Sequence, residues 1–408
     1  MQSPTETRPQ IASPKRLDYR FVYTLASYFK PIDLVSGIYI HIPYCKQACY
    51  YCDFHFSTSL QNKQQMVEAL KKELKLRTTY LSDPVIHTLY FGGGTPSLLD
   101  SHELADLIEM VRETYQLAPN AELTLEANPD DLTTEKLTQI KALGVNRLSI
   151  GVQSFDDEIL QYFNRSHDSS AAITSIREAQ GLGIENISID LIFGVPNQTR
   201  AMLQKDLDMA LSLDTPHISI YGLTIEEDTV FGKWHQQNKL TPMDDDLAGQ
   251  HLMLIMETLS AAGYEQYEVS NFSKPGWRSH HNSSYWSGTH YLGIGPAAHS
   301  YDGDSRQYNV SHNTKYIKAL KNGELDCEIE TLSQKDKITE FVLTQIRKSE
   351  GINLEQLRRQ LDYDLQRTKA AELSQLLAEQ LVYIEDNSLT LTQKGKLLGD
   401  WVTEQLIP

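Results

Sequence analysis

Short apolar, β-branched runs alternate with helical patterns through the first half of the chain. In the segments between the runs, apolar residues recur every three or four positions, as at Met66, Ala69, Leu70 and Leu74. We expect six strands, at residues 37–42, 86–91, 122–126, 146–151, 186–193 and 217–222. Successive strand, helix and strand units build parallel sheets with right-handed crossovers, and six of them curl the sheet. The sequence therefore predicts an α/β fold with a partial (β/α)6 barrel.

The last quarter of the chain has a different pattern. Helical periodicity lies around residues 338–346, 354–361 and 370–381, followed by two short strands at 381–384 and 389–391. Asp386 and Asn387 place a turn between these strands. We expect a winged-helix-like domain at residues 333–408, a barrel with its C-terminal elaboration at 37–310, a linker at 311–332, and an N-terminal extension at 1–36. A winged helix can read DNA, but it also serves as a packing or docking module.

The net charge and the mean hydropathy limit the classes of partner that we expect. The formal net charge is -17 at pH 7, which opposes the binding of nucleic acid over most of the surface. The mean hydropathy is -0.40, and no apolar run approaches the length that crosses a bilayer. No secretory leader is evident either, so we expect a cytoplasmic protein whose partners are small molecules or proteins. Transient docking to a membrane protein stays open.

Three of the four cysteines, Cys45, Cys49 and Cys52, lie within eight consecutive positions. Three clustered thiols cannot all pair with one another, and the cytoplasm keeps thiols reduced, so metal ligation is the favoured interpretation. They follow the first predicted strand, where parallel barrels gather their functional groups. Three thiolates on an iron-sulfur cubane leave one iron open. The alternative is a structural zinc with His41 or His55 as the fourth ligand.

The cysteine spacing, C-x3-C-x2-C, resembles that of the radical S-adenosylmethionine (SAM) superfamily. The flanking sequences YIHIPYC and CDF resemble the branch that contains oxygen-independent coproporphyrinogen III dehydrogenase and the HemW haem chaperones. The resemblance extends from Gly37 to the C-terminus and so includes a C-terminal domain of the HemN type. It implies a 4Fe-4S cluster on the three cysteines and SAM bound at the open iron.

The ends of successive strands carry groups that a bound SAM could use. The glycine turn after the second strand lets backbone approach a ligand closely. Carboxylates that follow apolar residues need partners, and a guanidinium suits a carboxylate. Each group also has an ordinary structural explanation in packing or ion pairing. The resemblance implies a SAM site made of Tyr39, Gly93, Gly94, Thr95, Glu126, Gln153, Arg165 and Asp190.

Two positions favour the chaperone branch over the dehydrogenase branch. The dehydrogenases carry a further cysteine where this chain has Phe54, and the HemW branch carries an H-N-x-x-Y-W signature, which here comprises His281, Asn282, Tyr285 and Trp286. Imidazoles can ligate iron, and aromatic rings offer faces to a flat macrocycle. His281 is our first candidate for the haem ligand and His280 the neighbour that could replace it. The alternative is that these residues only cap the barrel.

The hypothesis from sequence is thus a haem chaperone that binds a 4Fe-4S cluster and SAM and delivers haem to acceptor haemoproteins. No catalytic residue is assigned. The rival hypotheses are a radical decarboxylase of coproporphyrinogen III and a zinc-stabilised barrel that only docks partners.

Overall fold

The computed structural model describes residues 36–408, so the predicted N-terminal extension lies outside the described residues except for Ser36. Twelve strands form one sheet in the order β12-β11-β10-β9-β1-β2-β3-β4-β5-β6-β8-β7. Their bounds are β1 Gly37–Ile42, β2 Val85–Gly93, β3 Gln116–Ala127, β4 Arg147–Gln153, β5 Asn186–Phe193, β6 His217–Gly222, β7 Glu265–Gln266, β8 Asn271–Ser273, β9 Tyr291–Ile294, β10 His299–Tyr301, β11 Ser305–Asn309 and β12 Cys327–Thr331.

The first six strands are parallel neighbours in chain order, which confirms the predicted α/β fold and all six predicted strands. A seventh strand, β9, joins β1 in parallel on its other side, and Tyr39 there lies opposite Gly293. The remaining strands pair antiparallel at the two ends of this parallel core. Strand β1, which leads into the cysteine loop, is therefore flanked on both sides.

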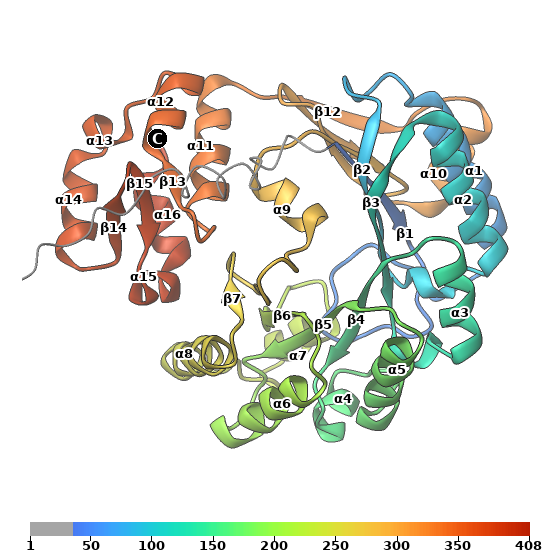
Figure 1. The fold of residues 1–408 in the computed structure, drawn as a ribbon, viewed down its shortest axis with the longest axis horizontal. Helices are drawn as coiled ribbons and strands as arrows, with labels where there is room; N and C mark the ends of the chain where they lie inside the picture. The colour runs from blue at the N-terminus through green and yellow to red at the C-terminus, as the bar shows by residue number, and fades with distance from the viewer. Residues whose placement is uncertain (1–35) are drawn as a thin grey trace, which may run out of the picture. The chain divides into compact units, whose positions relative to one another are not determined.

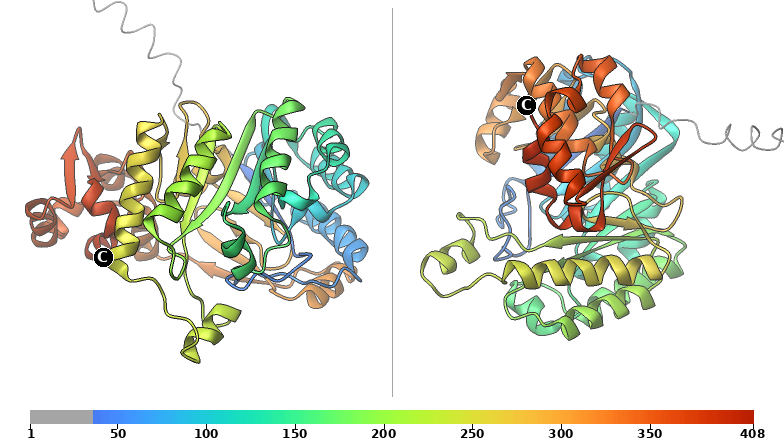
Figure 2. Two further views of the ribbon diagram at one scale, coloured as in Figure 1. Left: turned by 90° about the horizontal axis from the view of Figure 1, so that it is seen from below. Right: turned by 90° about the vertical axis from the view of Figure 1, so that its left-hand side faces the viewer.

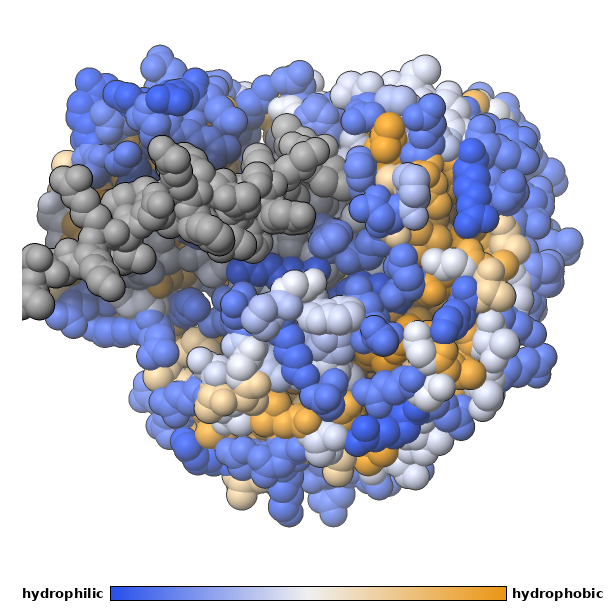
Figure 3. Space-filling view, in the orientation of Figure 1, coloured by the Kyte–Doolittle hydropathy of each residue, from blue (hydrophilic) through white to orange (hydrophobic). Residues whose placement is uncertain are grey.

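Helices cover the outer, convex face of the sheet (Figure 1). Helices α4 Asp157–Tyr162 and α7 Val230–Gln236 are exceptions, because they belong to a separate hydrophobic cluster that packs against Tyr50 and Tyr51 of the cysteine loop. The covering helices are α1 Lys63–Leu76, α2 Ser101–Thr114, α3 Thr134–Ala142, α5 Ser169–Gly181, α6 Arg200–Ser212, α8 Asp245–Ala261 and α10 Asn313–Lys321, while α9 His280–Trp286 lies within the concave side. The main hydrophobic core fills the space between these helices and the strands, where Ile38, Leu107 and Ile189 are fully buried. In Figure 3 an arc of hydrophobic residues follows this layer.

The inner face of the same strands is polar. Positions that alternate with the core residues carry Glu122, Thr124 and Glu126 on β3, and Arg147 and Ser149 on β4. A barrel whose interior is only a packed core would fill these positions with branched apolar residues. The polar interior therefore indicates a space that serves ligands.

Residues 311–332, which the sequence predicts as a linker, are structured. They contain helix α10 and strand β12 of the main sheet, and Tyr316 and Leu320 belong to the main core. The Tyr316 hydroxyl donates a 2.5 Å hydrogen bond to the buried carboxylate of Glu73 on α1. The segment is mostly polar because its elements expose one face to solvent, which made it look like a linker.

The C-terminal residues build a second, smaller hydrophobic core around Val342, Leu357 and Leu376. Its elements, orange to red in Figures 1 and 2, are α11 Gln334–Gln345, β13 Ile352–Asn353, α12 Leu354–Leu361, α13 Leu365–Thr368, α14 Ala370–Ala378, β14 Val382–Glu385, β15 Ser388–Leu391, α15 Gln393–Leu397 and α16 Gly399–Leu406. The three strands form a sheet in the order β13-β15-β14. Helices with a small antiparallel sheet are what the winged-helix prediction expects, although the domain boundaries themselves stay predictions. No helix within residues 36–408 combines the length and the apolar character that a bilayer crossing requires.

Candidate functional site

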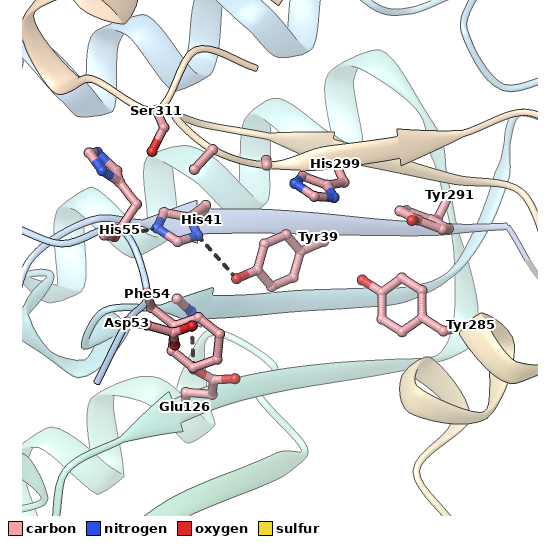
Figure 4. Close-up of a pocket in the computed structure, with 13 residues that line it drawn as sticks. Tyr39, His41, Asp53, Phe54, His55, Glu126, Tyr285, Tyr291, His299 and Ser311 are labelled. Carbon is pink, nitrogen blue, oxygen red and sulfur yellow. Dashed lines mark hydrogen bonds between the residues drawn. The ribbon is translucent and has the colours of Figure 1, made fainter. Parts of the chain in front are cut away.

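A cavity of about 520 Å³ opens on the concave side of the sheet. Figure 4 shows how its walls come from distant parts of the chain. The cysteine loop contributes Asp53 and Phe54, and the helix α9 contributes Tyr285. The strands and later turns supply Tyr39, His41, His55, Gly93, Glu126, Tyr291, Ala297, Ala298, His299 and Ser311. The cavity thus joins the cysteine loop, part of the predicted SAM site and the H-N-x-x-Y-W helix.

The cysteine loop is fixed by contacts along its whole length. The backbone N–H of Cys45 donates to the Ser57 carbonyl at 3.0 Å, and the Thr95 hydroxyl donates to the Cys45 sulfur at 3.4 Å. Arg165 Nη1 lies 3.4 Å from the Cys49 sulfur. All three thiols are partly buried rather than packed away. The loop therefore presents its sulfurs in a defined arrangement.

The spread of these sulfurs argues against a single zinc ion. Tetrahedral zinc at its usual 2.3 Å from sulfur places two thiolates about 3.8 Å apart. Within residues 36–408, the group of three potential ligand atoms that lie within 4.8 Å of one another is Asp100, His102 and Glu103, and it does not include the cysteines. A wider trio fits a cluster in which each thiolate binds its own iron.

Both ring nitrogens of His41 are also occupied. Nε2 bonds to the His55 carbonyl at 2.9 Å, and Nδ1 lies 3.2 Å from the Tyr39 hydroxyl (Figure 4). Burial lowers the pKa of His41 to about 4, so the ring is neutral near pH 7. His55 in turn places its Nε2 2.7 Å from Asn313 Oδ1. His41 therefore offers no free nitrogen to complete a Cys3His zinc site, and Nε2 of His55 is occupied as well.

The glycine turn after β2 packs against the cysteine loop. The backbone N–H of Gly94 donates to the Ile42 carbonyl at 2.9 Å, and that of Thr95 donates to the Tyr44 carbonyl. A Cβ on Gly94 would lie 2.7 Å from the Tyr44 carbonyl oxygen, and a Cβ on Gly93, whose φ is +104°, would lie 2.5 Å from the His41 ring. The turn thus needs glycine to reach the cysteine loop as well as any ligand.

Glu126 ends β3 at the cavity wall. Its carboxylate accepts hydrogen bonds from the Tyr90 hydroxyl at 2.7 Å and from the Gly93 backbone N–H at 3.1 Å. Burial, reinforced by the charge of Asp190, raises the pKa of Glu126 to about 7. A carboxylate has about four acceptor positions, so Glu126 can accept a further donor from a ligand in the cavity.

Gln153, Arg165 and Asp190 lie apart from the cavity lining among the described residues. Gln153 takes a left-handed backbone conformation, with φ +69°, at the end of β4. Asp190 pairs in register with Gly151 and accepts hydrogen bonds from Ser149 and Ser188.

Arg165 holds the loops around the cysteines together. Its Nη2 donates to Asn128 Oδ1 and to the Gly151 carbonyl, both at 2.7 Å, while Nη1 reaches Cys49 and lies 3.4 Å from the Tyr51 hydroxyl. The guanidinium thus connects the loops that follow β1, β3 and β4. These contacts show a positioning role that the sequence did not reveal, alongside the predicted contact with a SAM carboxylate.

The H-N-x-x-Y-W signature forms the short helix α9. His281 is only 1% exposed; its Nδ1 lies 2.8 Å from Thr88 Oγ1 and its Nε2 lies 3.0 Å from the Tyr285 hydroxyl. Burial, reinforced by the charge of Arg147, lowers the pKa of His281 to about 3, so the ring is neutral. His280 is exposed at the start of the same helix. His281, our first candidate for the haem ligand, thus has both ring nitrogens in hydrogen bonds in this conformation.

Both ends of α9 are anchored by residues that sequence reasoning missed. Glu122 on β3, 6% exposed, accepts hydrogen bonds from the backbone N–H groups of His280 and His281, each at 3.0 Å. At the other end, Gln345 of α11 donates to the Trp286 carbonyl at 2.6 Å. Asn282 closes the first turn, where its N–H donates to Ser279. One available signal was the polar residue at every second position of β3, which marks the strand's inner face as a site.

Comparisons with known proteins agree with this geometry. The radical SAM superfamily matches residues 39–210, and the HemN C-terminal domain matches residues 332–398. The coproporphyrinogen III oxidase HemN from Escherichia coli, described as a radical SAM enzyme, has the same fold with a TM-score of 0.79 at 24% identity. That match covers 96% of this chain and 93% of the other.

Curated relatives distinguish the chaperone branch from the dehydrogenase branch. The chain is 36% identical over 371 residues to the heme chaperone HemW of Bacillus subtilis, a match that covers 90% of this chain and 98% of the relative. It is also 36% identical over 376 residues to heme chaperone HemW of Mycobacterium tuberculosis, with 91% and 94% covered. The chain therefore belongs to the HemW heme chaperone family of the radical SAM superfamily.

Proposed function

We propose that Cys45, Cys49 and Cys52 hold a 4Fe-4S cluster. The observation that carries this proposal is the sulfur arrangement: the three sulfurs do not all lie within 4.8 Å of one another, and those of Cys45 and Cys49 are in contact with Thr95 and Arg165. A cluster with SAM at its open iron would supply one-electron chemistry next to the cavity. Because thiolate ligands need a reducing compartment, we propose the cytoplasm as the location.

We further propose that SAM lies along the ends of the parallel strands, between the cysteine loop and the cavity. Glu126 would accept from the amino group of SAM, since its carboxylate lines the cavity and keeps unused acceptor positions. Gly93, Gly94 and Thr95 would present backbone to the same end of the ligand. Asp190 would bind the ribose hydroxyls, while Tyr39, Gln153 and Arg165 complete the site.

We propose haem as the cargo and haemoproteins as its acceptors. The support is that Tyr285 of the H-N-x-x-Y-W helix lines the same cavity as Asp53 and Phe54 of the cysteine loop. Phe54 is 67% exposed, and a large exposed aromatic ring beside a cavity suits contact with a flat ligand. The C-terminal residues 333–408 would serve as a docking module, because Gln345 joins them to the haem helix.

Anaerobic reconstitution with iron and sulfide tests the cluster. We expect a brown protein with broad visible absorption and about four irons per chain. Replacing Cys45, Cys49 or Cys52 with alanine should abolish the iron, whereas Cys327→Ala, a partly buried cysteine in β12, should retain it. A colourless wild-type protein would refute the proposal.

Incubation of the reconstituted protein with haem, and separately with coproporphyrinogen III, tests the cargo. A Soret band without formation of protoporphyrinogen, followed by transfer of haem to an apo-haemoprotein, supports the chaperone. Decarboxylated product would instead establish the dehydrogenase reaction.

A further inference from the structure

The two nitrogens of His281 have unequal partners. Nδ1 lies against Thr88 on β2, which is 1% exposed inside the sheet. Nε2 lies against the hydroxyl of Tyr285, which is partly buried and lines the cavity. Of the two hydrogen-bond partners, Tyr285 is therefore the one that lies between the buried imidazole and the cavity lining.

The ring plane of His281 is fixed independently of Tyr285. The imidazole stacks on Tyr90, with ring centroids 4.8 Å apart and planes 20° apart, and Tyr39 stacks at 6.4 Å. The space for the Thr88 contact depends on Gly37, where a Cβ would lie 2.4 Å from the Thr88 hydroxyl. The imidazole can thus keep its position when one hydrogen bond is exchanged.

Tyr285 is held more weakly than the histidine behind it. Its ring makes edge contacts with His281 and with Tyr291, with centroids 5.0 and 4.6 Å apart. Within residues 36–408, its hydroxyl has His281 as its one hydrogen-bond partner. In Figure 4 the Tyr285 side chain points along the cavity rather than into the sheet. Rotation of this side chain would break one hydrogen bond and open the route to Nε2.

We propose that Tyr285 is a displaceable cap on Nε2 of His281, and that haem binding exchanges the tyrosine hydroxyl for the haem iron. This inference rests on the proposed haem cargo and adds the step by which a buried histidine becomes a ligand. With hydrogen on Nδ1, the ring donates to Thr88 and accepts from Tyr285. When the cap leaves, Nε2 carries a lone pair toward the cavity while Thr88 keeps the tautomer, the role that second partners of metal-bound histidines play. No proton has to leave the ring.

Tyr285→Phe tests the cap, because it removes the hydroxyl and keeps the ring. We expect haem affinity to rise about three- to tenfold, the value of one exchanged neutral hydrogen bond, with an unchanged Soret maximum. Tyr383→Phe, at a 43% exposed tyrosine on β14, is the matched control and should leave affinity unchanged. A Tyr285→Phe affinity equal to or below that of the wild type overturns the inference.

The other side of the ring gives a second test that does not depend on Tyr285. Thr88→Val should lower haem affinity about threefold and shift the iron-histidine stretching band, since Nδ1 loses its partner, and Thr88→Ser should restore both. His281→Ala should lose the band altogether. If His281→Ala keeps the wild-type spectrum, the ligand lies elsewhere and the cap is overturned while the haem cargo stands. If the wild-type protein binds no haem, the cargo itself is refuted.

Discussion

The two walls of the cavity differ in how much of their structure one short stretch of sequence supplies. The cysteine loop comes from one contiguous stretch, and its backbone bonds to its own neighbours and to the adjacent glycine turn, as Cys45 does with Ser57. Helix α9 has seven residues, too few to be stable alone, and depends on Glu122 and Gln345 from distant elements. The three cysteines of the first wall thus come from one short motif, although Arg165 supports them from a distance, whereas the haem wall depends on distant residues at both ends of its helix. The two walls should fail separately when their supports are removed.

Arg165→Ala should show the largest effect, and on the cysteine wall. It leaves the Gly151 carbonyl and Asn128 Oδ1 without their donor, so we expect the free energy of unfolding to fall by about 3 kcal/mol. Iron loss to a chelator should accelerate more than tenfold. Arg165→Lys keeps the positive charge but loses the paired donors of the guanidinium. Its stability and its rate of iron loss should therefore lie between those of the wild type and of Arg165→Ala. An unchanged rate of iron loss would show that the loop holds its cysteines without Arg165.

Glu122→Ala is the matching change on the haem wall. Two backbone N–H groups of α9 lose their acceptor, so we expect about 2 kcal/mol less stability and about tenfold weaker haem binding. Iron content and SAM affinity should stay at wild-type values, and Glu122→Gln, which keeps one acceptor oxygen, should be milder. Loss of iron in the same proportion as haem would mean that the two walls form one unit.

The pH dependence of SAM binding sharpens the role of Glu126. Because burial raises its pKa to about 7, the carboxyl is mostly protonated at pH 6 and mostly ionised at pH 8. The ionised form is the better acceptor for an ammonium group, so calorimetry should show SAM affinity rising up to about tenfold over this range. Glu126→Gln should flatten the profile; an equal slope in that variant would assign the titration to another group.

The same pKa fixes the sign of a stability effect. The folded protein binds the Glu126 proton more tightly than the unfolded chain, whose usual value is 4.5. This carboxyl therefore lowers stability as pH rises from about 4.5 to about 7, and adds no further change above that.

Gln345→Ala should give the smallest effect. It removes the donor to the Trp286 carbonyl, and we expect about 1 kcal/mol less stability and about twofold weaker haem binding. Gln334→Ala is the control, because Gln334 makes a similar bond to the Leu361 carbonyl within the C-terminal elements. If both variants change haem binding equally, the contact with α9 has no specific role.

Much of the fold was predictable because one face of each central strand is continuously apolar. Strands β1, β5 and β6 begin and end where the sequence predicted them. The later strands gave no such signal. Strand β12 exposes most of its side chains, and β9 is only four residues long, so neither carries enough periodicity.

The parts of the site whose residues lie close together in the sequence were the predictable ones. The cysteine trio and the glycine turn are short motifs whose chemistry follows from spacing. The partners of His281 were not predictable, since Thr88 and Glu122 precede it by well over a hundred positions and meet it only through the folded sheet. The assignment of His281 as the haem ligand stays a prediction, now with a condition that Tyr285 must move.

The parallel pairing of β1 with β9 has a consequence for biosynthesis. The strand that leads into the cysteines acquires its second neighbour only when residues Tyr291–Ile294 have been made. Until then, a growing chain on the ribosome carries β1 with one unpaired edge beside the thiols. The β1–β9 pairing joins residues far apart in the sequence, so it forms late. Insertion of iron and sulfide would thus belong to the end of translation or after it, and truncated chains that end before β9 should be the species most prone to aggregate through that edge.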